Sequence, residues 1–334
     1  MLGRPSRVRP SRYVTRVCVK RLLWKLLAIF AAVFVGLFGQ RTWISAEKRQ
    51  AGARGPDLVL VTSFWAADLR NSTTTSTPIK KENPHRREIE NAFVLNIGNS
   101  LFDEVRIVLE GHHHSYNCTT LRELLEEKLS LVHASTQTRF VCVEHDGPQP
   151  SYFEMFNYTT DIALNGSVII LANADMAFDQ TVLQLKDLNA HTAGTISTQG
   201  FGKGRWPPQS IQRQLKRLGM EPTKMRISNR CYARARRSSW DAYVFHFNSL
   251  NFNSSGFRDE VSGEKFTMNT MGAENAALYY LKHASPNITF NQICDHVDMW
   301  HIHASPKMHS SERWVSSPRA LASECADIAE CLGN

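Results

Sequence analysis

The sequence predicts an α/β fold built on a mostly parallel β-sheet with crossover helices. Apolar segments of strand composition alternate along the chain with segments of helical periodicity, which is typical of such sheets. Segment 167–172 is also apolar along nearly its whole length, as expected of a parallel strand covered on both faces. Asn173 and Asp175 follow at once, at the strand end where open α/β sheets bind their ligands.

The individual elements follow from local composition. Segment 57–64 is rich in Leu and Val and predicts the first strand, and segment 86–99 carries apolar residues at helical spacing. The first half predicts further strands at 105–109 and 139–143 and helices at 121–131 and 152–162, before the strand at 167–172. The second half predicts strands at 193–197 and 240–247 and a helix at 272–283, whereas 198–238 and 248–270 show no regular pattern.

The N-terminus predicts a membrane anchor. Segment 22–39 is apolar apart from Lys25, its length is close to that of a membrane-spanning helix, and seven basic residues precede it. This charge pattern predicts type II topology, although a signal peptide cleaved near Ser45 and Ala46 is the alternative. The predicted organisation is a cytosolic tail at 1–21, an anchor at 22–39, a stem at 40–56, a luminal domain at 57–310 and a Cys-containing tail at 311–334.

Glycosylation signals and cysteines agree with a luminal body. Six Asn-x-Ser/Thr sequons occur after the anchor, at Asn71, Asn117, Asn157, Asn165, Asn253 and Asn287. Six of the seven cysteines also follow it, and an even number suits disulfides in an oxidising compartment, with the pairing left open. Part of the net charge of +8 lies in the cytosolic tail. No nucleic-acid module is recognisable, so a nucleic-acid partner is not expected.

Four short segments carry the candidate chemistry. Asp175 is the best ligand for a hard cation, and the neutral Asn173 can bind a ribose hydroxyl or offer an amide oxygen; the alternative for this segment is an Asx turn or helix cap. Glu274 opens an apolar helix and is either a catalytic base or acceptor ligand, or a residue that stabilises the helix N-terminus. Asp241 precedes an aromatic strand. His301 and His303 are two positions apart in an extended segment, so both are expected to point the same way and could face one cavity. One of them is then a candidate metal ligand.

In order and spacing, these segments resemble a known family. Asn173-x-Asp175, the aromatic segment 240–245, Gly-Ala-Glu-Asn at 272–275 and His-Ile-His-Ala-Ser at 301–305 are similar to glycosyltransferase-like proteins with the nucleotide-diphospho-sugar transferase (A-type, Rossmann-like) fold. Segments 87–91 and 96–99 look like that group's first helix, and the resemblance covers about residues 58–313. It implies metal or catalytic roles for Asp175, Glu274 and one of His301 and His303. Asn173 and Asn275 depart from the family by replacing acids.

These observations lead to a specific functional hypothesis. The chain is expected to be a Golgi type II glycosyltransferase, with the endoplasmic reticulum as the alternative location, that moves a sugar from a nucleotide sugar to a glycan or glycoprotein with Mn²⁺ or Mg²⁺. Glu274 and Asp241 are the expected catalytic residues, with Glu274 as the base or a ligand of the acceptor. Ser63, Arg87, Asn173 and Asp175 are expected to bind the donor, Trp240 and Asn275 the acceptor, and Asp175, His301 and His303 the metal. The alternative is a non-catalytic carbohydrate-binding or chaperone-like protein on the same fold.

Overall fold

The computed structural model describes residues 57–65, 84–110, 117–134, 137–147, 149–160, 166–197, 207–221, 240–263, 266–268, 270, 272–302, 322–323, 325 and 327–333. The chain divides into two compact units, Met1–Arg54 and Gly55–Asn334, and every described residue belongs to the second. The predicted anchor and stem lie outside the described residues. Among the helices of the described part, none is long and apolar enough to cross a membrane.

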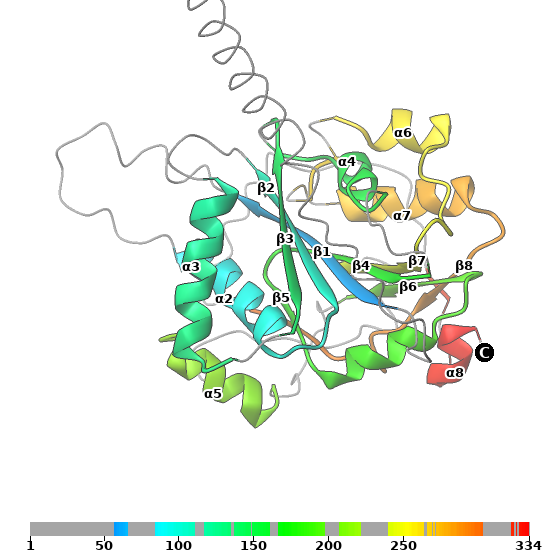
Figure 1. Ribbon diagram of the computed structural model, residues 1–334. Coiled ribbons are helices and arrows are strands. Elements are labelled where there is room, and N and C mark those ends of the chain that lie inside the picture. Colours follow the sequence, from blue (N-terminus) through cyan, green and yellow to red (C-terminus); the bar gives the residue numbers. More distant parts are fainter. Residues whose placement is uncertain are drawn as a thin grey trace, which may run out of the picture. The chain divides into compact units, whose positions relative to one another are not determined.

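A seven-stranded sheet forms the centre of the second unit (Figure 1). Its strands, in spatial order, are β3 (Arg139–His145), β2 (Glu104–Glu110), β1 (Leu58–Trp65), β4 (Val168–Ala172), β7 (Ala242–His246), β6 (Thr192–Ile196) and β8 (Thr289–Gln292). Neighbouring strands are parallel except at β7, which runs antiparallel to both β4 and β6. The predicted mostly parallel α/β sheet is confirmed.

Helices cover both faces of this sheet (Figure 1). One apolar cluster joins the sheet to α2 (Pro84–Gly98) and α3 (Cys118–Leu131). A second cluster, on the other face, joins it to α4 (Tyr152–Asn157), α6 (Ser255–Val261) and α7 (Ala273–Ala284). The strands between them are apolar on both faces because both faces are covered, which explains the continuous apolar runs in the sequence.

A small second sheet lies beside α2. It pairs β5 (Met176–Phe178) with β9 (Met299–His301) in antiparallel register, with Met176 opposite His301. A third apolar cluster packs it between α2 and α5 (Gln209–Arg217), through Leu95, Leu215 and Trp300 among others. The 3₁₀ helix η2 (Gln180–Asp187) follows β5, and α8 (Ile328–Leu332) packs next to β6 and β8. The small sheet brings two distant parts of the sequence together just beyond the end of β4.

Several sequence predictions need correction in detail. The helix expected at 152–162 ends at Asn157, where the Thr159 and Thr160 hydroxyls donate back to the carbonyls of Phe156 and Asn157. Such local bonds compete with a further helical turn. The two segments without a regular pattern contain α5 and α6, and η2, β5, β8, β9 and α8 were not predicted. Each of these elements is short or mainly polar, so it gives little periodic signal.

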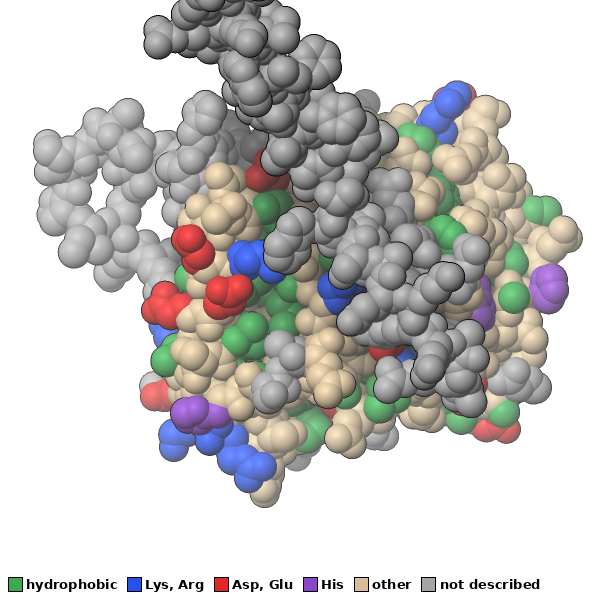
Figure 2. All heavy atoms as spheres, viewed as in Figure 1, with side chains coloured by type: hydrophobic (Ala, Val, Ile, Leu, Met, Phe, Trp, Pro, Cys, Tyr) green, Lys and Arg blue, Asp and Glu red, His purple; other side chains and the backbone are tan. Residues whose placement is uncertain are grey.

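Surface charge is divided between neighbouring helices. Figure 2 shows acidic side chains gathered over α3 and basic ones over α5, where Arg213, Lys216 and Arg217 are exposed. These are solvated helix faces of the ordinary kind. The sequence also contains five Arg residues between positions 226 and 237, which could face an anionic ligand but more often form a solvated face, and this segment lies outside the described residues.

Candidate functional site

Asp175 and His301 form a pair just beyond the carboxyl end of β4. The Asp175 carboxylate oxygen Oδ2 lies 2.5 Å from His301 Nε2, and the two side chains are 13% and 14% exposed. The backbone also links these segments, because the Ile302 N–H donates to the Asp175 carbonyl at 2.8 Å. The paired carboxylate and imidazole therefore lie at the sheet edge where α/β folds bind ligands.

Helix α2 contributes to the same place from both of its ends. The Nδ1 of His85, in the first turn of this helix, forms a hydrogen bond of 3.0 Å with the Glu88 carboxylate. This bond raises the pKa of His85, as does the charge of Asp175, whereas burial and His301 lower it. His85 is therefore close enough to the Asp175–His301 pair to feel the charge of both. Near the other end of α2, the Asn96 amide bonds to the backbone of β5.

A second polar group lies on the face covered by α4 and α7. The Asn173 amide Nδ2 donates to Asp241 Oδ1 at 3.3 Å, and the Asn173 N–H donates to the Asp241 carbonyl at 2.9 Å. The Tyr243 hydroxyl donates to the backbone carbonyl of Glu274. Burial raises the pKa of Tyr243 well above its usual value, and the charges of Glu274 and Asp241 add to this shift. Asp241 and Glu274 thus both lie close enough to the buried Tyr243 phenol to raise its pKa, and Asn173 joins this group through Asp241.

Glu274 owes its place to the start of α7. Gly272 precedes this helix with φ of 87°, a left-handed conformation that favours glycine, and the helix begins at Ala273. Glu274 and its neighbour Asn275 are both 8% exposed. The predicted Gly-initiated turn before an apolar helix is confirmed, and a carboxylate in this first turn is favoured by the helix dipole.

Glu110 is a buried acid at the same edge that the sequence did not single out. It is the last residue of β2 and only 1% exposed, and among the described residues its Oε2 has no hydrogen-bond partner. Burial raises its pKa to about 7, although a hydrogen bond with Ser63 opposes the shift. Ser63, a predicted donor ligand, therefore lies at the edge but contacts Glu110. The register places His145 of β3 opposite Glu110.

The other predicted site residues have these positions. Arg87 donates to the carbonyls of Leu218 and Gly219, just after α5, at 3.0 and 3.2 Å. Trp240 is 2% exposed in the apolar cluster on the α4 and α7 face, and no residue in the described part of the chain forms a hydrogen bond with its Nε1. His303 lies outside the described residues. The ligand-binding roles of all these residues stay predictions.

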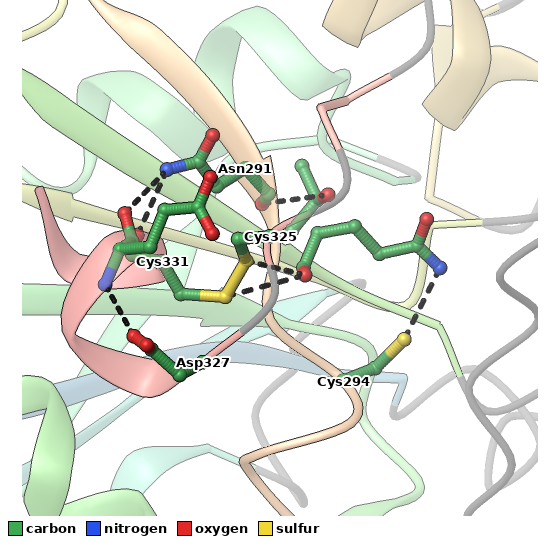
Figure 3. Close-up of a disulfide and its surroundings, with 8 residues drawn as sticks. Asn291, Cys294, Cys325, Asp327 and Cys331 are labelled. Atoms are coloured by element: carbon green, nitrogen blue, oxygen red, sulfur yellow. Dashed lines mark hydrogen bonds between the residues drawn. A yellow bond between two sulfur atoms is a disulfide. The ribbon is translucent and has the colours of Figure 1, made fainter.

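The chemistry of the Asp175–His301 pair fits a divalent cation. A carboxylate oxygen and an imidazole nitrogen are ligands that Mn²⁺ accepts, and diphosphate and water complete such sites. A different group, His296, Cys325 and Cys331, has ligand atoms within 4.8 Å of one another. However, Cys325 and Cys331 form a disulfide, so neither sulfur is a thiolate in this state (Figure 3). Disulfides also join Cys118 to Cys142 and engage Cys294, which confirms the expected cysteine pairing in general.

No protein-family model matches the sequence, and no curated protein matches it. Solved structures of remotely similar shape are sugar nucleotidyltransferases and related enzymes. One, described as a glucose-1-phosphate thymidylyltransferase from Bacillus anthracis, is 11% identical, with 72% of this chain and 88% of that chain covered and a TM-score of 0.36. A nucleoside-diphosphate-sugar pyrophosphorylase from Vibrio cholerae is 11% identical, with coverages of 71% and 91% and a TM-score of 0.35. An inositol-1-phosphate CTP transferase from T. maritima is 11% identical. The match covers 58% of this chain and 72% of that chain, with a TM-score of 0.28. These likenesses are too remote to assign a reaction to this chain.

Proposed function

We propose that this protein is a glycosyltransferase that uses a nucleotide-sugar donor. The observation that carries the proposal is the hydrogen-bonded pair of Asp175 and His301 at the carboxyl edge of the sheet. An Asp that only capped a turn would bond to nearby backbone N–H groups, as Asp179 does with Thr181. The Asp175 carboxylate meets an imidazole from a strand more than a hundred positions further along the chain, which a local turn does not require.

In this proposal Asp175 and His301 hold the cation that neutralises the diphosphate of the donor. Bound Mn²⁺ or Mg²⁺ would supply Lewis-acid stabilisation of the leaving nucleotide. His85, on the rim of the same group, would add a donor of hydrogen bonds for phosphate oxygens. Ser63, Asn173 and Arg87 remain the proposed donor-binding residues along the edge of β1, β4 and α2.

The acceptor side of the proposed site contains Asp241 and Glu274. Asp241 directly precedes β7, Glu274 lies in the first turn of α7, and both are buried, at 2% and 8% exposed. In this proposal one of the two carboxylates takes the proton of the acceptor hydroxyl. Asn173 orients Asp241 through its amide. Tyr243 ties the first turn of α7 to β7 and thereby fixes Glu274. Trp240 and Asn275 complete the proposed acceptor side, and a glycan or glycoprotein is the proposed acceptor.

The proposed setting is the secretory pathway, with the N-terminal segment as a type II anchor in the Golgi membrane. The motivation is the sequence alone: the apolar segment, the basic residues before it and the six sequons after it. Microscopy of a tagged chain and its sensitivity to an N-glycosidase test this setting. Diffuse cytosolic protein without glycans would contradict it.

The decisive experiment measures nucleotide release from a panel of nucleotide sugars, with Mn²⁺ or EDTA. We expect release with one donor, and a fall of about a hundredfold or more in Asp175→Asn, as when a charge-stabilising group is removed from an active site. Asp179→Asn is the matched control, because this carboxylate caps η2 only four positions away. Equal loss in both variants, or no effect of either, would contradict the assignment of Asp175.

The same experiment distinguishes the alternative class. A non-catalytic carbohydrate-binding protein on this fold would bind sugars without binding or releasing any nucleotide, with or without metal. In that outcome Asn173 and Asn275, which stand where the family resemblance expects acids, would be the residues to restore first.

A further inference from the structure

A buried side chain of helix α2, that of Asn96, forms hydrogen bonds with the strand that follows Asp175. Asn96 is 1% exposed and lies near the carboxyl end of the helix. Its Nδ2 donates to the Met176 carbonyl at 2.8 Å, and its Oδ1 accepts from the Phe178 N–H at 3.0 Å. One amide therefore satisfies two backbone groups of the three-residue strand β5.

These two bonds occupy the edge of β5 that faces away from β9. Strand β5 pairs with β9 on one edge, with Ala177 opposite Trp300 and Met176 opposite His301. The other edge would leave buried backbone groups without partners, at a cost of about 1–3 kcal/mol each. Asn96 takes the place of a third strand, so β5 is bonded along both edges.

Asn96 also fixes the position of β5 along α2, which apolar packing alone determines only weakly. Strands β5 and β9 pack between α2 and α5 through apolar side chains, and such contacts are not directional. The two amide bonds are directional and set the position of β5 along α2. Asp175 directly precedes this strand, and its carbonyl accepts from Ile302. A slip of β5 would therefore move the Asp175 carboxylate relative to His301.

We propose that Asn96 is a positioning residue that sets the geometry of the Asp175–His301 pair for a divalent cation. This inference rests on the proposed function for the identity of the ligand, but the placement of the pair can be measured without metal. Residues that orient metal ligands without touching the metal typically strengthen metal binding, and their removal lowers metal affinity by about tenfold to a hundredfold.

The test compares Asn96→Leu with Asn291→Leu in the full chain. Asn291 is a matched control because it is also a buried amide, 6% exposed, that donates to a backbone carbonyl, that of Cys331, at 2.9 Å (Figure 3). It ties β8 to α8 and lies outside the candidate site. Mn²⁺ affinity is measured by electron paramagnetic resonance of the free ion. The His301 ring is observed by NMR in metal-free protein, with its signals assigned by their loss in His301→Gln.

We expect Asn96→Leu to weaken Mn²⁺ binding by about tenfold to a hundredfold and to shift the His301 signals. Asn291→Leu should lower thermal stability but leave both readouts unchanged. If Asn96→Leu does not fold, Asn96→Asp replaces it, since a carboxylate can still accept from Phe178 but, when ionised, cannot donate to Met176.

Each outcome decides one question. Unchanged Mn²⁺ affinity and unchanged His301 signals in a folded Asn96 variant would overturn the inference. If the unaltered protein binds no Mn²⁺, the metal of the proposed function is wrong. In that case His301 signals that move in the Asn96 variant, and stay in the Asn291 variant, still support Asn96 as the residue that positions the pair.

Discussion

Asp175 and Asp179 show how the setting of a carboxylate decides what it does. They are four positions apart and follow the same strand, yet Asp179 accepts from the Thr181 N–H at the start of η2 while Asp175 meets His301. The difference arises from β9, which comes from a distant part of the chain and places the imidazole of His301 against Asp175. The Asp179 carboxylate instead caps the N-terminus of η2.

Glu110 gives a prediction for the pH dependence of stability. Its pKa is raised from 4.5 to about 7, so between these values the folded state keeps a proton that the unfolded state loses. Stability contributed by the protonated acid is complete below the unfolded pKa, falls as pH rises through this window and levels off above about pH 7. Glu110→Gln should remove this pH dependence. The free energy of unfolding of the variant, relative to that of wild type, should therefore rise by up to about 3 kcal/mol between low pH and high pH.

Urea unfolding at several pH values measures the effect. Glu123→Gln, on the exposed face of α3, is the control for the loss of one negative charge. A difference between Glu110→Gln and wild type that stays constant with pH would contradict the raised pKa.

The sequence identified part of the candidate site at the residue scale. Asp175, His301, Asp241 and Glu274 were singled out because acids and imidazoles at strand and helix ends are unusual enough to notice. His85, Asn96 and Glu110 were missed, since a polar residue inside a helix or at the end of an apolar strand has no distinctive spacing. Their roles depend on which distant side chain faces them, and only the tertiary contacts show this.

At the scale of elements, predictability followed length and composition. Strands β1, β2, β3 and β4 were predicted near their observed bounds because each is rich in β-branched and other apolar residues, even though Arg106 interrupts β2. The three-residue strands β5 and β9 are too short to show a period, although they build the site. The antiparallel direction of β7 was also out of reach, because side-chain alternation is the same in both directions.

Helix α7 gives a prediction at this scale. Gly272 adopts φ of 87° just before the helix, and a side chain there is strained by about 1–2 kcal/mol. Gly272→Ala should lower the free energy of unfolding by about this amount and reduce catalysis further by moving Glu274. Gly256→Ala in α6, where a Cβ would meet nothing within 4 Å, should be neutral or slightly stabilising.

Thermal unfolding and nucleotide release distinguish these effects. A loss of stability in Gly272→Ala with full activity would show that Glu274 does not depend on this turn. Equal destabilisation by both substitutions would show that the positive φ is not the cause.

At the scale of the whole unit, the site lies where both packed faces of the sheet meet its carboxyl edge. Asp175, His301 and His85 are associated with the small sheet and α2, whereas Asp241, Tyr243 and Glu274 belong to the face covered by α4 and α7. The edge is thus supported from two sides by separate apolar clusters. This arrangement lets β4 present one group of polar side chains to each side.

The disulfides allow a prediction for the stability of the unit as a whole. Cys118–Cys142 closes a loop with a sequence separation of 24, and Cys325–Cys331 one of 6. Because a crosslink stabilises mainly by restricting the unfolded chain, its effect grows with loop length. Replacing both cysteines of the first pair by Ala should lower the free energy of unfolding by about 3 kcal/mol. Replacing both cysteines of the second pair should lower it by about 2 kcal/mol.

Urea unfolding of each double variant measures these costs, with wild type under a thiol reductant as the reference for losing all crosslinks. A larger cost for the second pair would show that buried Cys331, fully enclosed beside β8, stabilises the unit through packing more than through its crosslink.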